Sequence, residues 1–342
     1  MKGSRSFPAI ASLVGAEDRW QNSQIAFVDG EQGPPMPLLK RGVLSYLDLH
    51  VNGTLAYTQA ASTAAVTGNA LFPWGLVRQY ETDVGANTKF NASVGGYDLM
   101  VWETYRHPSY APAYTAPLPP ANSGSSSVSG NLSWSWRQRL PVSVDEADLT
   151  GLVLLDRPDA ETVAQIYWRH VSSLLTVPSG SSVSFTGAAN ITAYGYQLGQ
   201  LGNPKYASVL GVAHVLQAVP VTVPSQTEIM VPLLLNRSIQ AIFMIPYVDG
   251  IPDTTSQIAV DKVILQIGDA RPVSLSAAEL RFNDQLRARG NIPAGVLVLD
   301  RMRNRPTQYL NLFTVNQAFV TIQFASAPPA GATFNFLYEY LR

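Results

Sequence analysis

The residues best able to bind a metal ion are scattered along the chain. The four histidines are His50, His107, His170 and His214. No two of them stand two or four positions apart, the spacings that place two imidazoles on one face of a strand or a helix. The chain has no cysteine, which excludes thiolate ligands, thiolate nucleophiles and disulfides. We therefore predict no metal site, and ordinary core or surface positions for the histidines.

Carboxylates offer two further kinds of chemistry. The acidic run from Asp145 to Asp148 could hold calcium, but it lacks the regular spacing of a calcium-binding loop. A solvated turn is the favoured interpretation. Glu103, beside Trp102, and Asp156 could act as the acid pair of a glycosidase.

The dipeptide Asp156-Arg157 recurs as Asp300-Arg301. Repetition is expected of a scaffold and seldom of one catalytic centre, so a structural ion pair or the end of a strand is favoured. The chain also lacks a nucleophile elbow, a phosphate-binding glycine loop and a dinucleotide fingerprint. We predict no catalytic residue, no cofactor and no enzymatic activity.

Two tryptophans could recognise sugars. Trp134 and Trp136 alternate with serine and so share one face of a strand, the geometry of a platform for stacking sugar rings. The favoured interpretation places both rings inside a sheet interface. A secreted carbohydrate-binding or glycan-processing β-sandwich is nevertheless kept as the alternative function.

Arginine clusters at Arg281–Arg289 and Arg301–Arg305 could contact phosphate. The net charge is −1, however, and the chain has no basic tail, so direct binding of nucleic acid is not expected. Pairing with carboxylates of another subunit is the favoured role.

The composition indicates a surface that is covered by other proteins. Charged residues make up 14% of the chain and apolar residues 46%, whereas about 25% charged residues is usual for soluble domains. The basic residues are 18 arginines and 5 lysines, and protein interfaces are enriched in arginine and depleted of lysine. We expect a chain that is buried in an assembly.

Strand patterns dominate the sequence. From Val43 to Val51, apolar residues alternate with polar ones, as in a half-buried strand. Segments 239–245 and 260–267 have the continuous apolar character of central strands. Only 96–106 and 276–289 look helical, the first with Tyr97, Met100, Val101 and Tyr105 on one face, the second with Ala278, Phe282 and Leu286.

The chain contains an internal repeat. Segment 151–157 begins with glycine and ends with Asp-Arg, and a similar segment occurs at 295–301, an offset of 144 residues. At the same offset, Tyr194-Gly195-Tyr196 corresponds to Tyr338-Glu339-Tyr340. Segment 77–85 corresponds to 260–268 at an offset of 183 residues, and each copy precedes one of the two helices. The strands 162–168 and 306–312 match only in pattern, and chance similarity of short apolar strands is the alternative.

Two all-β halves, each with a helix in a long connection, resemble the double jelly-roll major capsid proteins of tailless icosahedral bacteriophages and their hexon-like relatives. The repeated Gly-apolar-Asp-Arg strands and the two helices carry the resemblance. It implies an all-β fold of two tandem eight-stranded jelly-roll β-sandwiches, with no catalytic site. It also implies homotrimers that form pseudo-hexameric tiles of a virion shell, with neighbouring trimers, minor capsid or penton proteins and an internal membrane as partners.

The expected organisation has three parts. Residues 1–40 form an N-terminal arm, 41–205 the first jelly-roll and 206–342 the second. The start of the chain resembles a weak signal peptide, but Pro8 and Ser12 interrupt its apolar core, so an arm docked on a neighbour or facing a membrane is favoured. A Pro/Ser-rich excursion, 107–130, lies on the surface or over a neighbour. The expected location is the virion, after synthesis in the host cytoplasm.

Overall fold

The structure is a computed structural model that describes residues 17–38, 42–84, 88–107, 114–142, 153–154, 161–196, 214–288, 292–300 and 309–341. It is mostly β, as expected from the strand patterns. The chain divides into two compact units. Unit 1 comprises Met1–Thr67, Val77–Ala92 and Ala113–Val215, and unit 2 comprises Gly68–Leu76, Ser93–Pro112 and Leu216–Arg342.

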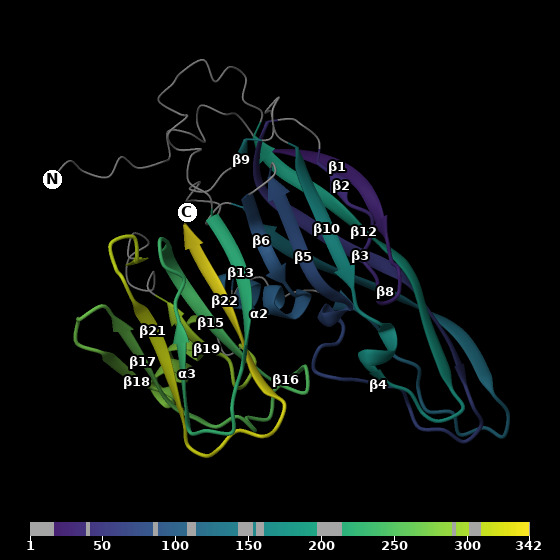
Figure 1. Cartoon of the computed structure of the whole chain (residues 1–342). Helices are drawn as coiled ribbons and strands as arrows, with labels where there is room; N and C mark the ends of the chain where they lie inside the picture. Colours follow the sequence, from purple (N-terminus) through teal and green to yellow (C-terminus); the bar gives the residue numbers. More distant parts are fainter. Residues whose placement is uncertain are drawn as a thin grey trace. The chain divides into compact units, whose positions relative to one another are not determined.

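Unit 1 contains one large antiparallel sheet. Its strand order is β1 (Glu17–Ala26), β12 (Ser182–Tyr196), β3 (Val43–Gln59), β8 (Val128–Pro141) and β7 (Tyr114–Thr115), with β9 (Val153–Leu154) also paired to β3. Figure 1 shows β3, β8 and β12 as long neighbouring ribbons. Along β3 the side chains of Ser45, Leu47, Leu49 and Val51 are buried and those between them are half-buried, so the predicted alternation is confirmed from Ser45 on. Leu44, predicted on the opposite face, is buried as well.

The second layer of unit 1 contains four strands. It has the order β6 (Thr88–Val94), β5 (Val77–Val84), β10 (Thr162–Trp168) and β2 (Met36–Pro37). Strand β10 buries every second residue, among them Ala164, Ile166 and Trp168. A two-stranded pair, β4 (Thr67–Gly68) and β11 (Leu175–Thr176), and a 3-10 turn, Val171–Ser173, complete this part of the chain.

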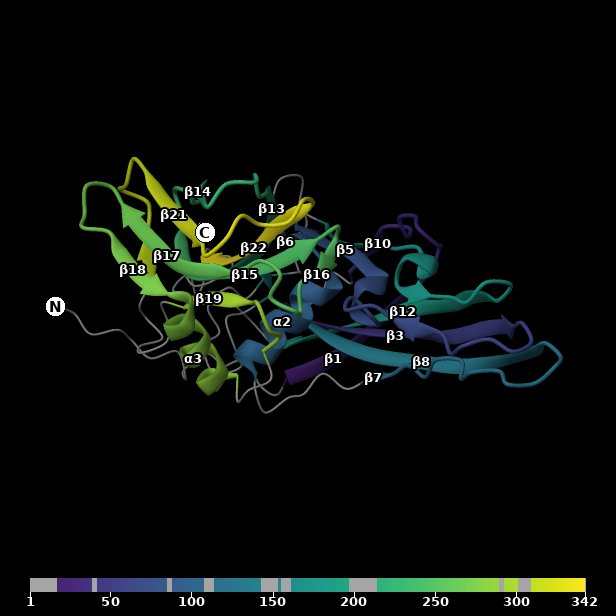
Figure 2. The ribbon, with the colours of Figure 1, turned by 90° about the horizontal axis from the view of Figure 1, so that it is seen from below.

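Unit 2 also has two sheets, which Figure 2 shows from a second direction. The first has the order β16 (Ile251–Pro252), β15 (Ser238–Val248), β22 (Ala332–Leu341) and β13 (His214–Thr222), and β15 also pairs with β19 (Leu297–Asp300) and β20 (Leu310–Asn311). The second has the order β14 (Glu228–Pro232), β21 (Ala318–Phe324), β17 (Val260–Ile267) and β18 (Val273–Ser276).

The same eight-strand order therefore occurs twice. In unit 1, β1-β12-β3-β9 form one layer and β2-β10-β5-β6 the other; in unit 2, β13-β22-β15-β19 and β14-β21-β17-β18 take the same places. The strands of the predicted repeat are equivalent pairs: β5 with β17, β9 with β19, and β12 with β22. The internal repeat is confirmed, and its eight strands are those of a jelly-roll.

One alignment within the repeat was wrong. The segment 162–168 was matched to 306–312, but β10 has its topological counterpart in β21, which lies at 318–324. Both strands have the same alternation of buried and half-buried residues. Alternation alone cannot fix an offset when the loops before the two strands differ in length.

Both helices form where the sequence predicts them. Helix α2 (Gly96–Arg106) follows β6, and α3 (Ala277–Arg287) follows β18 and begins with Ser276 as its N-cap, which accepts a hydrogen bond from the Glu279 N–H at 3.1 Å. Each therefore lies in the expected connection of its half. By packing, however, α2 belongs to unit 2, as does the 3-10 turn η1 (Trp74–Leu76).

The predicted inward face of α3 is wrong. The side chains of Ala278, Phe282 and Leu286 lie outside, and the helix buries Ala277, Leu280 and Asp284 instead. The Asp284 carboxylate accepts a hydrogen bond from the Val298 N–H at 2.9 Å. This bond to the start of β19 turns a polar residue inward. In α2, Tyr97, Val101 and Tyr105 are buried as predicted, but so is most of the rest of the helix.

The described part of the Pro/Ser-rich excursion lies on unit 1 itself. Strand β7 pairs with β8, and Asn122 forms backbone hydrogen bonds in both directions with Thr63. The Asn122 side chain donates to the Ala60 carbonyl at 2.9 Å. For residues 114–130 these contacts favour a surface excursion packed on unit 1 over an arm that extends away from it.

Candidate functional site

A buried charge cluster lies at the end of β19. The Asp300 carboxylate accepts hydrogen bonds from Arg106 Nη1 at 3.1 Å and from the Tyr105 hydroxyl at 3.3 Å. Its third partner is Arg287 Nη1 at 3.0 Å. Asp300 is thus both the last residue of a strand and a member of an ion pair, as the sequence predicted for the repeated Asp-Arg. Its cationic partners come from α2 and α3; Arg301 lies outside the described residues.

Arg106 joins Asp300 to a second buried acid. Its Nε donates to Glu339 Oε2 at 2.9 Å, and its Nη2 donates to the same oxygen. Burial alone would lower the pKa of Arg106, but Glu339 and Asp300 raise that pKa above its ordinary value. The guanidinium therefore remains charged, and each acid keeps a positive partner in the interior.

The other end of α2 is anchored in the same unit. The Asp98 carboxylate accepts hydrogen bonds from the Tyr247 hydroxyl at 2.8 Å and from the Asn335 amide at 2.6 Å. Helix α2 is thus held at its first and last turns by polar contacts to β15, β19 and β22. These polar contacts position the helix within unit 2.

The described residues that were candidates for enzymatic or sugar chemistry are buried. Glu103 and Trp102 are fully buried in α2, while Asp156 and the acidic run 145–148 lie outside the described residues. Trp134 and Trp136 are also buried. The Trp134 ring stacks on Phe185 with centroids 5.2 Å apart, and its N–H donates to the Pro117 carbonyl at 2.9 Å. The interior interpretation of both tryptophans is confirmed.

His50 and His170 have different partners within unit 1. His50 Nε2 is 2.9 Å from Ser135 Oγ, and His170 Nδ1 is 3.1 Å from an Asp29 carboxylate oxygen. Burial and the nearby Arg137 lower the pKa of His50 below its ordinary value of 6.5. Within the described ranges, no three histidine or acidic side chains gather in a way that could hold a metal ion. Nor is either described helix long and apolar enough to span a bilayer.

An apolar surface lies on α3. Phe282 and Leu286 stand one helical turn apart, and each side chain is 62% exposed. Two large apolar side chains on one helix face are a feature of surfaces that bind other proteins. The sequence did identify these residues as one face, but it assigned that face to the core.

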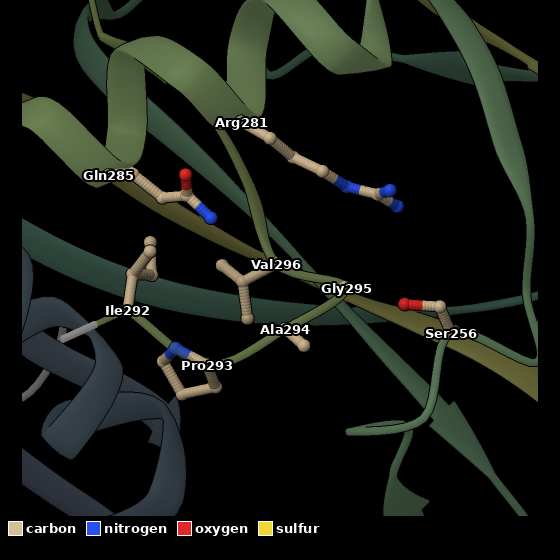
Figure 3. A pocket seen from close by; sticks show the side chains of 8 residues that line it. All are labelled: Ser256, Arg281, Gln285, Ile292, Pro293, Ala294, Gly295 and Val296. Atoms are coloured by element: carbon tan, nitrogen blue, oxygen red, sulfur yellow. The ribbon is translucent and has the colours of Figure 1, made fainter. Parts of the chain in front are cut away.

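A half-enclosed cavity of about 210 Å³ opens beside the same helix (Figure 3). Arg281 and Gln285 of α3 line one side, the segment Ile292–Val296 lies across from them, and Ser256 contributes from a loop. In Figure 3 the Arg281 side chain extends from α3 toward the side of the cavity where Ser256 lies. Arg281 is the one charged residue among the eight that line the cavity.

Arg281 differs from the other arginines described above. Its Nε and Nη2 atoms are buried, and no described residue accepts a hydrogen bond from either. Arg287, in the same predicted basic cluster, pairs with Asp300 within the chain. Arg289 and the cluster 301–305 lie outside the described residues.

Comparisons with known proteins identify the fold. No protein-family model and no curated protein sequence matches the chain. Among solved structures, the major capsid protein of Sulfolobus turreted icosahedral virus is similar with a TM-score of 0.69 and 17% identity, covering 95% of this chain and 97% of that one. The Faustovirus major capsid protein has a TM-score of 0.63 at 8% identity, covering 96% and 90%.

The similarity extends to a bacteriophage. The major capsid protein P2 from bacteriophage PM2 has a TM-score of 0.55 at 10% identity, covering 95% of this chain and 97% of that one. These similar structures are all double jelly-roll proteins. Because they match both units of this chain over nearly their whole length, the chain has the double jelly-roll fold of viral major capsid proteins.

Proposed function

We propose that this chain is the major capsid protein of an icosahedral virus, a structural protein and not an enzyme. The main observation behind the proposal is that the same order of eight strands occurs twice in one polypeptide. Two similar sandwiches in each chain allow three chains to form a ring of six similar units. Such a pseudo-hexameric homotrimer can pack against its neighbours in a continuous shell.

Two further observations support a protein whose surface is covered in an assembly. The chain is poor in charge, and its basic residues are mainly arginine, as in protein interfaces. Helix α3 exposes Phe282 and Leu286 to solvent in the isolated chain. The platform required by the glycan-binding alternative is missing from the surface, because Trp134 and Trp136 are buried.

The proposal includes the finer organisation expected from the sequence. Residues 41–205 and 206–342 hold most of the two sandwiches of a tile. Strands β1 and β2 of the first sandwich lie within the expected arm, residues 1–40, so the arm proposed to contact an adjacent trimer or an internal membrane is residues 1–16. Neighbouring trimers and minor capsid or penton proteins are the partners, and the genome is not contacted directly. The protein is made in the host cytoplasm and resides in the virion. Unchanged assembly after deletion of residues 1–16, which leaves β1 intact, would contradict the role of the arm.

Light scattering coupled to size-exclusion chromatography tests the central part of the proposal. The full chain should elute as a stable particle of about three times its 37.0 kDa mass, with no tendency to dissociate on dilution through the micromolar range. A monomer at all concentrations would contradict the proposal. A monomer that also binds glycans would favour the alternative function.

A further inference from the structure

We propose that the outward face of α3 is a docking site for the N-terminal arm, residues 1–16, of a second copy of the chain. The inference rests on the proposed function, since it assumes that copies of the chain associate. It goes beyond that function by naming the surface that receives the arm. It also selects a protein surface, and not a membrane, as the partner of the arm.

Helix α3 carries two opposite stripes of side chains with the same spacing. The residues that it buries in unit 2 stand at positions i, i+3 and i+7 of the helix. The stripe on the opposite side has this spacing too, and it consists of Glu279, Phe282 and Leu286. All three lie outside, and Phe282 and Leu286 are each 62% exposed. Anchors at i, i+3 and i+7 are the pattern by which helices bind other polypeptides, so we call this set the outer stripe.

Glu279 gives the outer stripe a negative charge. No described residue forms an ion pair with its carboxylate. The arginines of α3 are engaged elsewhere, because Arg287 pairs with Asp300 and the Nε and Nη2 atoms of Arg281 are buried. The outer stripe therefore offers one acid in the first turn of the helix and apolar surface in the turns that follow.

The arm has the complementary order of residues. Its only charged side chains are Lys2 and Arg5, and a mainly apolar run, 7–14, follows them. An arm that runs along α3 in the direction of the helix would bring Arg5 to Glu279 and the apolar run over the rest of the outer stripe. Opposite charges fix the register of such a contact, and the apolar surface supplies most of its free energy.

The arm is attached where it can reach a neighbouring chain. It leads directly into β1, which begins at Glu17 and is an end strand of the large sheet of unit 1. Sixteen extended residues span up to about 55 Å. A segment tethered in this way within an oligomer is held near its site at a concentration on the order of millimolar. A contact of modest area is then sufficient for docking.

A protein partner accounts for both surfaces, whereas a membrane accounts for one. An anionic membrane would attract Lys2 and Arg5 and bury the apolar run. It would leave Phe282 and Leu286 in water and Glu279 without a cation. Docking of the arm on the outer stripe removes the apolar surface of both from water and pairs their charges.

Disulfide cross-linking of the full chain tests the inference. The chain has no cysteine, so two introduced thiols report on one contact. At a concentration where light scattering shows an oligomer, the double variant Ile10→Cys with Leu286→Cys should form covalent dimers of twice the 37.0 kDa chain mass when oxidised. Each single variant should stay monomeric on a denaturing gel. Ile10→Cys with Met230→Cys is the matched control and should form no link, since Met230 is 58% exposed in the same unit.

A charge exchange in the double-cysteine chain tests the pairing of Arg5 with Glu279. Arg5→Glu and Glu279→Arg should each slow formation of the link about two- to fivefold, as expected for the loss of an exposed ion pair. The two changes together should restore the rate, which a purely structural role of either residue would not do. Phe282→Ser should slow the link about tenfold and leave Tm unchanged, because the side chain is exposed.

Several results would overturn the inference. A disulfide formed only within one chain would show that the arm folds back on its own α3. An oligomer without the link would show that the arm docks elsewhere, and the proposed function would stand. If such an oligomer also bound vesicles of anionic phospholipid through residues 1–16, the arm would belong to a membrane. A wild type that is monomeric at all concentrations would contradict both the inference and the proposed function.

Discussion

Arg106 and Arg281 lie in the same unit and direct the same edge of the guanidinium at different surroundings. Arg106 meets Glu339 and Asp300, both almost fully buried. Arg281 meets a cavity in which no described residue accepts its Nε and Nη2 hydrogen bonds. The difference shows that the first arginine contributes to the fold of the isolated chain through two ion pairs, whereas the second buries two donors that no described residue accepts.

The largest loss of unfolding free energy is expected when Arg106 is replaced. Arg106→Ala leaves Glu339 without its cation and Asp300 with Arg287 only, so the free energy of unfolding should fall by about 3–5 kcal/mol. Urea denaturation followed by tryptophan fluorescence measures this loss. A change in unfolding free energy below about 1 kcal/mol would show that the cluster contributes little to stability. Arg106 and Arg281 would then not differ as described.

An intermediate effect is expected at Asp253, which shapes the cavity of Arg281. Burial alone would raise the pKa of Asp253, but hydrogen bonds from the Ile258, Gln257 and Thr255 backbones lower it below its ordinary value of 3.8. Asp253→Asn should therefore cost about 1–2 kcal/mol of unfolding free energy near neutral pH.

The lowered pKa of Asp253 also predicts how its contribution to stability depends on pH. A carboxylate with a lowered pKa stabilises the fold above its ordinary pKa, and the contribution disappears as the pH falls through the folded value. The difference in unfolding free energy between wild type and Asp253→Asn should thus shrink below pH 3.8. A difference that stays constant from pH 7 to 3 would show that the charge of Asp253 plays no part.

The smallest effect on stability is expected at Arg281 itself. Arg281→Leu removes buried donors that have no acceptor among the described residues, so the unfolding free energy should stay within about 0.5 kcal/mol of the wild type or rise. Thermal denaturation of dilute protein is the measurement. A loss comparable to that of Arg106→Ala would mean that Arg281 has a structural partner within the chain, and the comparison would fail.

Much of the fold could be predicted from the sequence. Alternation from Val43 to Val51 identified a strand of unit 1, and glycine followed by an apolar run ending in Asp300 identified β19 and its counterpart. These signals succeed because a strand that is half buried must alternate, and because equivalent strands in two similar sandwiches meet similar neighbours. The two helices were found by their period and by the Ser276 cap.

Other features depend on contacts that a linear pattern does not contain. The equivalence of β10 and β21 depends on which strands pair, and the inward face of α3 depends on the Asp284 bond to Val298. The sequence flagged a basic cluster at Arg281–Arg289, yet nothing in it distinguishes Arg287, which pairs with Asp300, from Arg281. That distinction exists only after folding has brought one acid within reach.

The most direct test of the central claim is a reconstruction by electron cryomicroscopy of virus particles that contain this protein. The account predicts a shell built from several hundred copies of the chain, in which each copy contributes two β-sandwiches to a pseudo-hexagonal tile. Particles with only a few copies per virion, or with the chain outside the shell, would contradict it.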